Sequence, residues 1–110
     1  MTNYTGTIID KNEPKEYGEL MTAEEARQLK DYMTSVVDYG TASVLAGRSY
    51  SAAGKTGTAE YSSDKSKDHS WFVGIANVEH PDLAISVIIE GSDGSAKAVN
   101  VAKAVFDAYY

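Results

Sequence analysis

The sequence contains no cysteine, only two prolines and a single tryptophan among its 110 residues. Without cysteine the chain can form neither a disulfide framework nor a thiolate metal site. Its two histidines also lack a second ligand at the spacing typical of zinc sites. Basic residues are few: ten Lys and Arg face sixteen Asp and Glu, and the net charge is −6. We therefore expect no thiolate or zinc site. We also expect no nucleic-acid partner, because nucleic-acid binding relies on basic patches.

Long hydrophobic runs are also missing. No apolar run approaches the ~18 residues that a membrane span needs, and the printed sequence carries no signal-peptide pattern. The longest mostly apolar stretch, residues 83–89, has the length of a strand. Hydrophobic residues make up 43% and charged residues 24% of the chain, which is typical of a globular protein and not of a disordered one. The length corresponds to one domain.

Hydrophobic periodicity and turn residues predict two helices and three strands. Thr22 and Glu25 match a capping box at the start of the first helix, and Gly40 is expected to end it in a left-handed conformation. The last strand is apolar enough for burial on both faces. The chain is predicted to begin with a polar lead-in over 1–20 that contains a short strand at 5–9. Helix 23–39, a helical turn at 42–46 and strands 50–61, 71–78 and 83–90 follow. The last element is helix 95–109, whose apolar stripe consists of Val99, Ala102, Val105, Phe106 and Tyr109.

The connections between the predicted strands are short, and short connections join antiparallel neighbours. The loop at 62–69 is charged, and residues 79–82 read as a turn. Helices packed against an antiparallel sheet define an α+β domain. We therefore expect one α+β unit over residues 1–110 with a sheet of three main strands.

The most informative segment is Gly54-Lys55-Thr56-Gly57-Thr58. A nucleotide-binding P-loop is one interpretation, but it needs a glycine at position 49, which is serine, and a helix directly after the motif. Residues 59–61 and the charged loop after them do not begin a helix. The P-loop is therefore a remote alternative.

The other interpretation is the Lys-Thr-Gly motif of penicillin-recognising enzymes with an active-site serine. Acyl transfer at a peptide that ends in a carboxylate needs a cation, hydroxyl donors and a backbone amide near the developing oxyanion. Lys55 can supply the cation, and Thr56 and Thr58 the hydroxyls. Gly57 removes a side chain that would block the approach.

The neighbouring segments make this match specific. VVDYGTA at 36–42, AGKTGTAE at 53–60 and HSWFVGIA at 69–76 are followed by an apolar strand and a terminal helix. In this order and spacing, residues 21–110 resemble the C-terminal part of the transpeptidase domain of a high-molecular-mass penicillin-binding protein, most similar to class B. The resemblance implies part of the fold shared by penicillin-binding proteins and serine β-lactamases.

The resemblance also implies a role for each residue of the motif. Lys55 would lie beside the catalytic serine, and Thr56 and Thr58 would bind the terminal carboxylate of a D-Ala-D-Ala stem peptide or of a β-lactam. Gly57 would line the same substrate site, and the backbone N–H of Thr58 would be one of two oxyanion donors. No metal or organic cofactor is implied. The intact protein would work at the extracytoplasmic face of a bacterial membrane.

The sequence departs from that family in its nucleophile. It contains no Ser-x-Asn, and its one Ser-x-x-Lys, Ser62 to Lys65, follows the Lys-Thr-Gly strand and lies in a charged loop. A nucleophile needs the start of a buried helix to hold its lysine close. We therefore expect a fragment of a serine D,D-transpeptidase that is inactive alone and whose missing N-terminal part is its partner.

Two further expectations remain open. A β-lactam sensor or a non-catalytic interaction module of the same fold is the alternative function, although residues 58–60 and 71–74 favour the transpeptidase. Strand 83–90 would have a bare edge if the rest of the domain is absent. Such an edge is a template for pairing with another chain, so we expect self-association through it.

Overall fold

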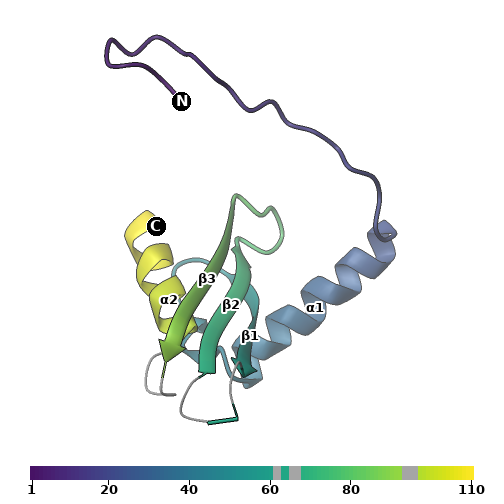
Figure 1. Ribbon diagram of the computed structural model, residues 1–110. Coiled ribbons are helices and arrows are strands. Elements are labelled where there is room, and N and C mark those ends of the chain that lie inside the picture. The colour runs from purple at the N-terminus through teal and green to yellow at the C-terminus, as the bar shows by residue number, and fades with distance from the viewer. Residues whose placement is uncertain (61–62, 65–67, 93–96) are drawn as a thin grey trace.

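The computed structural model describes residues 1–60, 63–64, 68–92 and 97–110, and it shows two helices around a three-stranded antiparallel sheet (Figure 1). This confirms the predicted α+β class. The elements in chain order are helix α1 (Ala23–Tyr39), the short 3₁₀ helix η1 (Ser43–Leu45), strands β1 (Ala52–Glu60), β2 (Asp68–Ala76) and β3 (Leu83–Ser92), and helix α2 (Ala98–Tyr109).

Helix α1 begins with the predicted capping box. The Glu25 N–H donates to Thr22 Oγ1 at 3.2 Å, and the Thr22 N–H donates to Glu25 Oε1 at 3.1 Å. The bond from the Thr22 backbone lowers the pKa of the Glu25 carboxyl. Helix α1 ends at Gly40 as predicted, but the predicted left-handed conformation is wrong, because the φ of Gly40 is −121°, which is extended. Glycine is needed there because a Cβ would lie 2.9 Å from the Val36 carbonyl oxygen.

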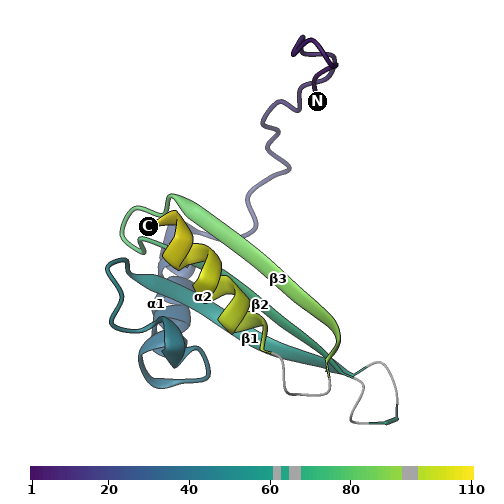
Figure 2. The same cartoon turned by 90° about the vertical axis from the view of Figure 1, so that its left-hand side faces the viewer.

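The three strands lie in the order β1-β2-β3, and each neighbouring pair is antiparallel. The register sets Thr56 of β1 opposite Phe72 of β2, and Phe72 opposite Val87 of β3. Helix α2 covers one face of the sheet and contacts β2 and β3, whereas α1 lies on the opposite side and contacts β1 (Figure 2). The molecule therefore has three layers, with the sheet in the middle.

The core lies between α2 and the sheet. Phe72 and Ala76 of β2 meet Val99, Ala102 and Phe106 of α2, and all five are buried. Leu83, Ile85, Val87 and Ile89 of β3 are half-buried against this core, whereas the residues between them are exposed. The expectation that strand 83–90 is buried on both faces is therefore wrong, because among the described residues a helix layer covers only one of its faces.

The element boundaries differ from the predictions in several places. Residues 1–20 are an irregular lead-in that extends away from the sheet (Figure 1), but the strand predicted at 5–9 is only an isolated bridge between Thr2 and Ile8. Strand β2 begins at Asp68 and ends at Ala76, since Asn77 turns the chain with a positive φ of 58°. Val105 and Tyr109 of α2 are exposed, contrary to the predicted stripe.

Other predictions concern residues outside the described ranges. The start of the last helix at 95, the loop residues 61–62 and 65–67, and the Ser62 to Lys65 pattern fall there in whole or in part. Within the described residues, no helix is long and apolar enough to cross a bilayer.

Candidate carboxylate-binding site

Strand β1 carries Lys55 to Thr58 along an outer edge of the sheet, because β2 is its one strand neighbour among the described residues. The Asn77 N–H donates to the Ser51 carbonyl at 2.7 Å, so these two residues form a hydrogen-bonded pair directly before the strand. In an antiparallel ladder such pairs alternate with pairs that exchange no hydrogen bonds. Thr56 and Thr58 therefore direct their N–H and C=O groups away from β2, toward the open edge.

The side chains of the motif alternate between the two faces of the sheet. Thr56 and Thr58 share the face of Phe72, which α2 covers, whereas Lys55 and Gly57 belong to the opposite face. Lys55 is exposed, and its Nζ donates to the Thr56 carbonyl oxygen at 2.7 Å. That carbonyl is one of the groups directed outward, so the ammonium group lies at the same open edge as the two threonine amides.

Gly57 lies directly opposite Trp71 of β2. A Cβ on Gly57 would overlap Cε2 and Cζ2 of the indole, so the ring of Trp71 occupies the space that a side chain on β1 would fill. Glycine at this position thus lets the backbone of the motif rest on the indole. Trp71 is half-buried, and it also lines a cavity.

This cavity has a volume of about 410 Å³. It holds Thr56, Gly57 and Thr58 of the predicted site, whereas Lys55 stands outside it. Six further polar residues that the motif did not indicate line it as well: Thr41, Asp68, Ser70, Ser92, Lys97 and Asn100. The apolar lining residues are Val44, Trp71, Ala98 and Val99.

Specific contacts hold two of the residues that sequence reasoning missed, Thr41 and Ser70. Thr41 Oγ1, in the connection after α1, lies 2.7 Å from Thr56 Oγ1. Ser70 Oγ accepts a hydrogen bond from the Ala98 N–H at 2.9 Å, which anchors the first turn of α2 to β2. Asp68 Oδ1 is buried without a hydrogen-bond partner among the described residues. The one signal in the sequence was the position of Ser70 and Thr41 inside the segments that carry the family resemblance.

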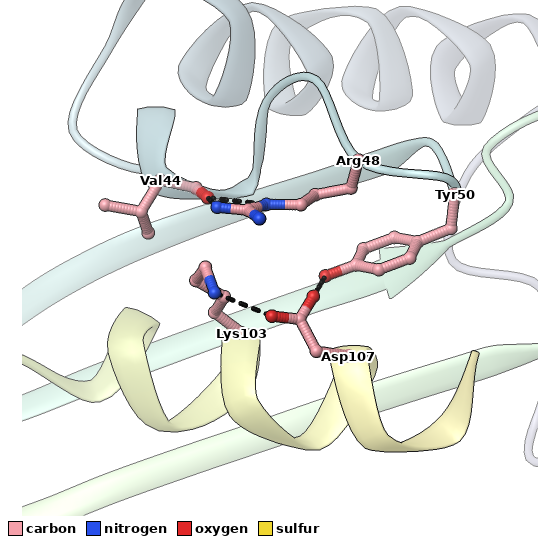
Figure 3. A network of polar contacts seen from close by, with 5 residues as sticks. All are labelled: Val44, Arg48, Tyr50, Lys103 and Asp107. Carbon is pink, nitrogen blue, oxygen red and sulfur yellow. Dashed lines mark hydrogen bonds and ion pairs between the residues drawn. The ribbon is translucent and has the colours of Figure 1, made fainter.

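A polar network connects the segment directly before β1 with α2 (Figure 3). Tyr50 O–H donates to Asp107 Oδ1 at 2.7 Å, and Lys103 Nζ donates to Asp107 Oδ2 at 2.6 Å. Burial and the bond to Asp107 raise the pKa of Tyr50 to about 12, and the bonds from Lys103 and Tyr50 lower the pKa of Asp107. Arg48 donates from Nε and Nη2 to the Val44 carbonyl oxygen.

The arrangement suits an anion that accepts hydrogen bonds. Hydroxyl groups, outward-directed amides and the ammonium group of Lys55 meet at one edge, and Lys97 lines the adjoining cavity. Hydrogen bonds to an ionised acceptor are the strong ones. No group of three or more His, Asp or Glu side chains that could hold a metal ion occurs in the described part of the chain.

Comparison with known proteins finds a family that matches the chain. The profile of the penicillin binding protein transpeptidase domain matches residues 2–109. Peptidoglycan D,D-transpeptidase MrdA of Acinetobacter baumannii is 33% identical over 99 aligned positions, and the match covers 78% of this chain and 15% of that protein. MrdA of Haemophilus influenzae is 34% identical over 79 aligned positions, and the match covers 59% of this chain and 12% of that protein.

Solved structures show the same likeness. The D,D-transpeptidase domain of a peptidoglycan glycosyltransferase from Eggerthella lenta is 32% identical, with a TM-score of 0.71 over 98% of this chain and 26% of that one. Penicillin-binding protein A from M. tuberculosis, solved as an imipenem acyl-enzyme complex, has a TM-score of 0.77 at 22% identity and shows the shared fold over 24% of its chain. The chain therefore spans about a quarter of these solved chains.

Proposed function

Because the chain belongs to the family of penicillin-binding protein transpeptidase domains, we propose that it provides the carboxylate-recognition strand of a peptidoglycan D,D-transpeptidase. One observation carries the proposal: Thr56 and Thr58 line a cavity at the edge of β1 where their backbone amides point away from the sheet. An acyl-D-Ala-D-Ala stem peptide and a β-lactam both present a carboxylate near an acyl carbon, so both are ligands of the proposed site.

Each residue of the motif then has a role. The hydroxyls of Thr56 and Thr58 donate to the ligand carboxylate, and the ammonium of Lys55 at the same edge attracts it. The Thr58 N–H donates to the oxygen that becomes negative when the acyl carbon is attacked, and loss of one such donor typically costs about 10²–10³ in rate. Gly57 keeps the face above the indole of Trp71 free of a side chain.

The attacking group is proposed to come from polypeptide other than this segment. The sequence contains no Ser-x-Asn, and its one Ser-x-x-Lys follows the motif strand. In the intact enzyme a serine would attack the penultimate D-Ala carbonyl, D-Ala would leave, and an amine of a second stem peptide would take the acyl group. That reaction belongs outside the cytoplasmic membrane, where peptidoglycan is joined.

Two partners follow from this proposal. The remainder of a transpeptidase domain, which carries the serine, is the first. A second copy of the chain, pairing through the outer edge of β3, is the other when that remainder is absent. The structure supports the second partner because β3 has a strand neighbour on one side only among the described residues.

The proposal is tested with the 110-residue chain itself. We expect N-acetyl-D-Ala-D-Ala to shift the amide resonance of Thr58 in a titration followed by NMR, and the same peptide with a C-terminal amide to bind more weakly. Fluorescent penicillin should leave no labelled band at 11.8 kDa on a denaturing gel, because no serine attacks it. Equal affinity for the two peptides would contradict carboxylate recognition, and a labelled band would contradict the missing nucleophile.

A further inference from the structure

Thr41 reaches the motif strand from a distant part of the fold. It lies in the connection between α1 and η1, 15 residues before Thr56, and the two side-chain oxygens are 2.7 Å apart. Both threonines line the 410 Å³ cavity together with Gly57 and Thr58. Thr56 therefore shares its hydroxyl group between the cavity and Thr41.

The number of protons at this contact decides what Thr56 can do. A threonine hydroxyl has one proton to donate and two lone pairs that accept, whereas a carboxylate only accepts. If Thr56 donated to Thr41, it would have no proton left for a carboxylate in the cavity. If Thr41 donates to Thr56, the proton of Thr56 is free for the anion, and the two bonds in a row polarise and strengthen each other.

The backbone around Thr41 is fixed on both sides. The Gly40 N–H and the Ala42 N–H both donate to the Val36 carbonyl oxygen, at 3.0 and 3.2 Å, and Ala42 is fully buried. The backbone of Gly40 packs so closely on Val36 that a Cβ would lie 2.9 Å from its oxygen. The end of α1 thus holds the Thr41 hydroxyl at one place over β1.

We infer that Thr41 is a positioning residue of the carboxylate site, which donates its proton to Thr56 and so directs the Thr56 hydroxyl toward the anion. This inference rests on the proposed function, and it adds a residue from outside the motif strand. Thr41 acts through Thr56 and not by its own contact with the carboxylate.

The experiment compares four forms of the 110-residue chain, the wild type, T41V, T56V and the double variant, with T41S as the conservative control. Valine has nearly the shape of threonine but no hydroxyl. We expect T41V to raise the Kd for N-acetyl-D-Ala-D-Ala by about 3- to 10-fold, the usual effect of one lost neutral hydrogen bond. T41S should stay within about 2-fold of the wild type, since it keeps the donor.

Two readouts separate positioning from a structural effect. The C-terminally amidated peptide should bind T41V and the wild type alike, because the bond to a neutral acceptor is weaker. In the T56V background T41V should have no further effect, since double-mutant cycles reveal residues that act as a unit. A wild-type chain without preference for the carboxylate overturns the proposed function. If T41V keeps the preference for the carboxylate peptide over the amide, only the role of Thr41 is overturned. The same holds if T41V lowers the affinity as much in the T56V background as in the wild type.

Discussion

At the scale of single residues, the contact between Gly57 and Trp71 shapes the candidate site. The indole of β2 fills the space beside the motif strand, and the glycine opposite it leaves the backbone free to rest there. Cross-strand neighbours of this kind are a main source of sheet stability. The position of the proposed oxyanion donor in β1 thus depends on a ring from the next strand.

Replacing Gly57 with alanine tests this dependence. Because the new methyl group overlaps the indole, we expect G57A to lower the free energy of unfolding by about 1–3 kcal/mol, as overpacking usually does. Urea titration followed by the fluorescence of Trp71, the single tryptophan of the chain, measures this. T58A is the matched control, because its side chain is exposed and its loss should cost within about 0.5 kcal/mol. Equal stability of G57A and the wild type would contradict the close contact.

At the scale of elements, the segment that leads into β1 is fastened to α2. Tyr50 is 5% exposed, its ring packs 5.6 Å from that of Phe106, and its hydroxyl donates to Asp107 (Figure 3). Lys103 donates to the other oxygen of the same carboxylate. Helix α2 therefore holds the start of the motif strand through a buried phenol and an ion pair.

The variant Y50F keeps the ring and removes the hydrogen bond, so we expect a loss of about 1–2 kcal/mol in the free energy of unfolding at pH 8. The pH dependence follows from the pKa of Tyr50, which is raised to about 12. A raised pKa means that the folded state binds the phenol proton more tightly, so this contribution is complete below pH ~10 and disappears as the pH rises toward 12.

We therefore expect the stability difference between the wild type and Y50F to shrink between about pH 10 and about pH 12 in urea titrations. Tyr110, whose pKa is also raised to about 12, is present in both proteins and cancels in the difference. Y39F is the control, because Tyr39 is 89% exposed and its hydroxyl should contribute little. A difference that stays constant with pH would argue against the tether.

At the scale of the whole molecule, the sheet formed by the described residues ends in β3, which has a strand neighbour on one side only. Alternate residues of β2 form their backbone hydrogen bonds with β1 and with β3. In β3, the residues that bond to β2 are therefore Leu83, Ile85 and Val87. The backbone groups of Ala84, Ser86 and Ile88 point to the outer edge. Ile88 is also 59% exposed. An apolar edge without proline or lysine along these residues invites a further strand, and an antiparallel copy of β3 fits it.

Pairing of two copies is tested with S86P. Proline removes the outward N–H of Ser86 and leaves the bonds to β2 intact, since edge strands tolerate proline on the solvent side. We expect sedimentation to show a concentration-dependent dimer for the wild type and for S86T, and a folded monomer for S86P. A wild-type chain that remains monomeric at its highest soluble concentration would rule out the pairing.

The order of the main elements, the bounds of α1 and the identity of the motif could be predicted from local patterns. Capping at Thr22, apolar spacing in α1 and the Gly-Lys-Thr-Gly-Thr string are properties of neighbouring residues, and the structure has helix α1 and the motif strand where these patterns indicated. The reason for Gly40 was mistaken because its close contact with Val36 has the same sequence signature as a left-handed helix end.

Only the tertiary structure decided the contacts between segments that are distant in the chain. The bond between Thr41 and Thr56, the indole beneath Gly57 and the single buried face of β3 depend on strand register and on which layer covers which face. Composition and periodicity state which residues can be buried or can donate a proton. Packing selects their partners, because each of these contacts forms only when separate elements have docked.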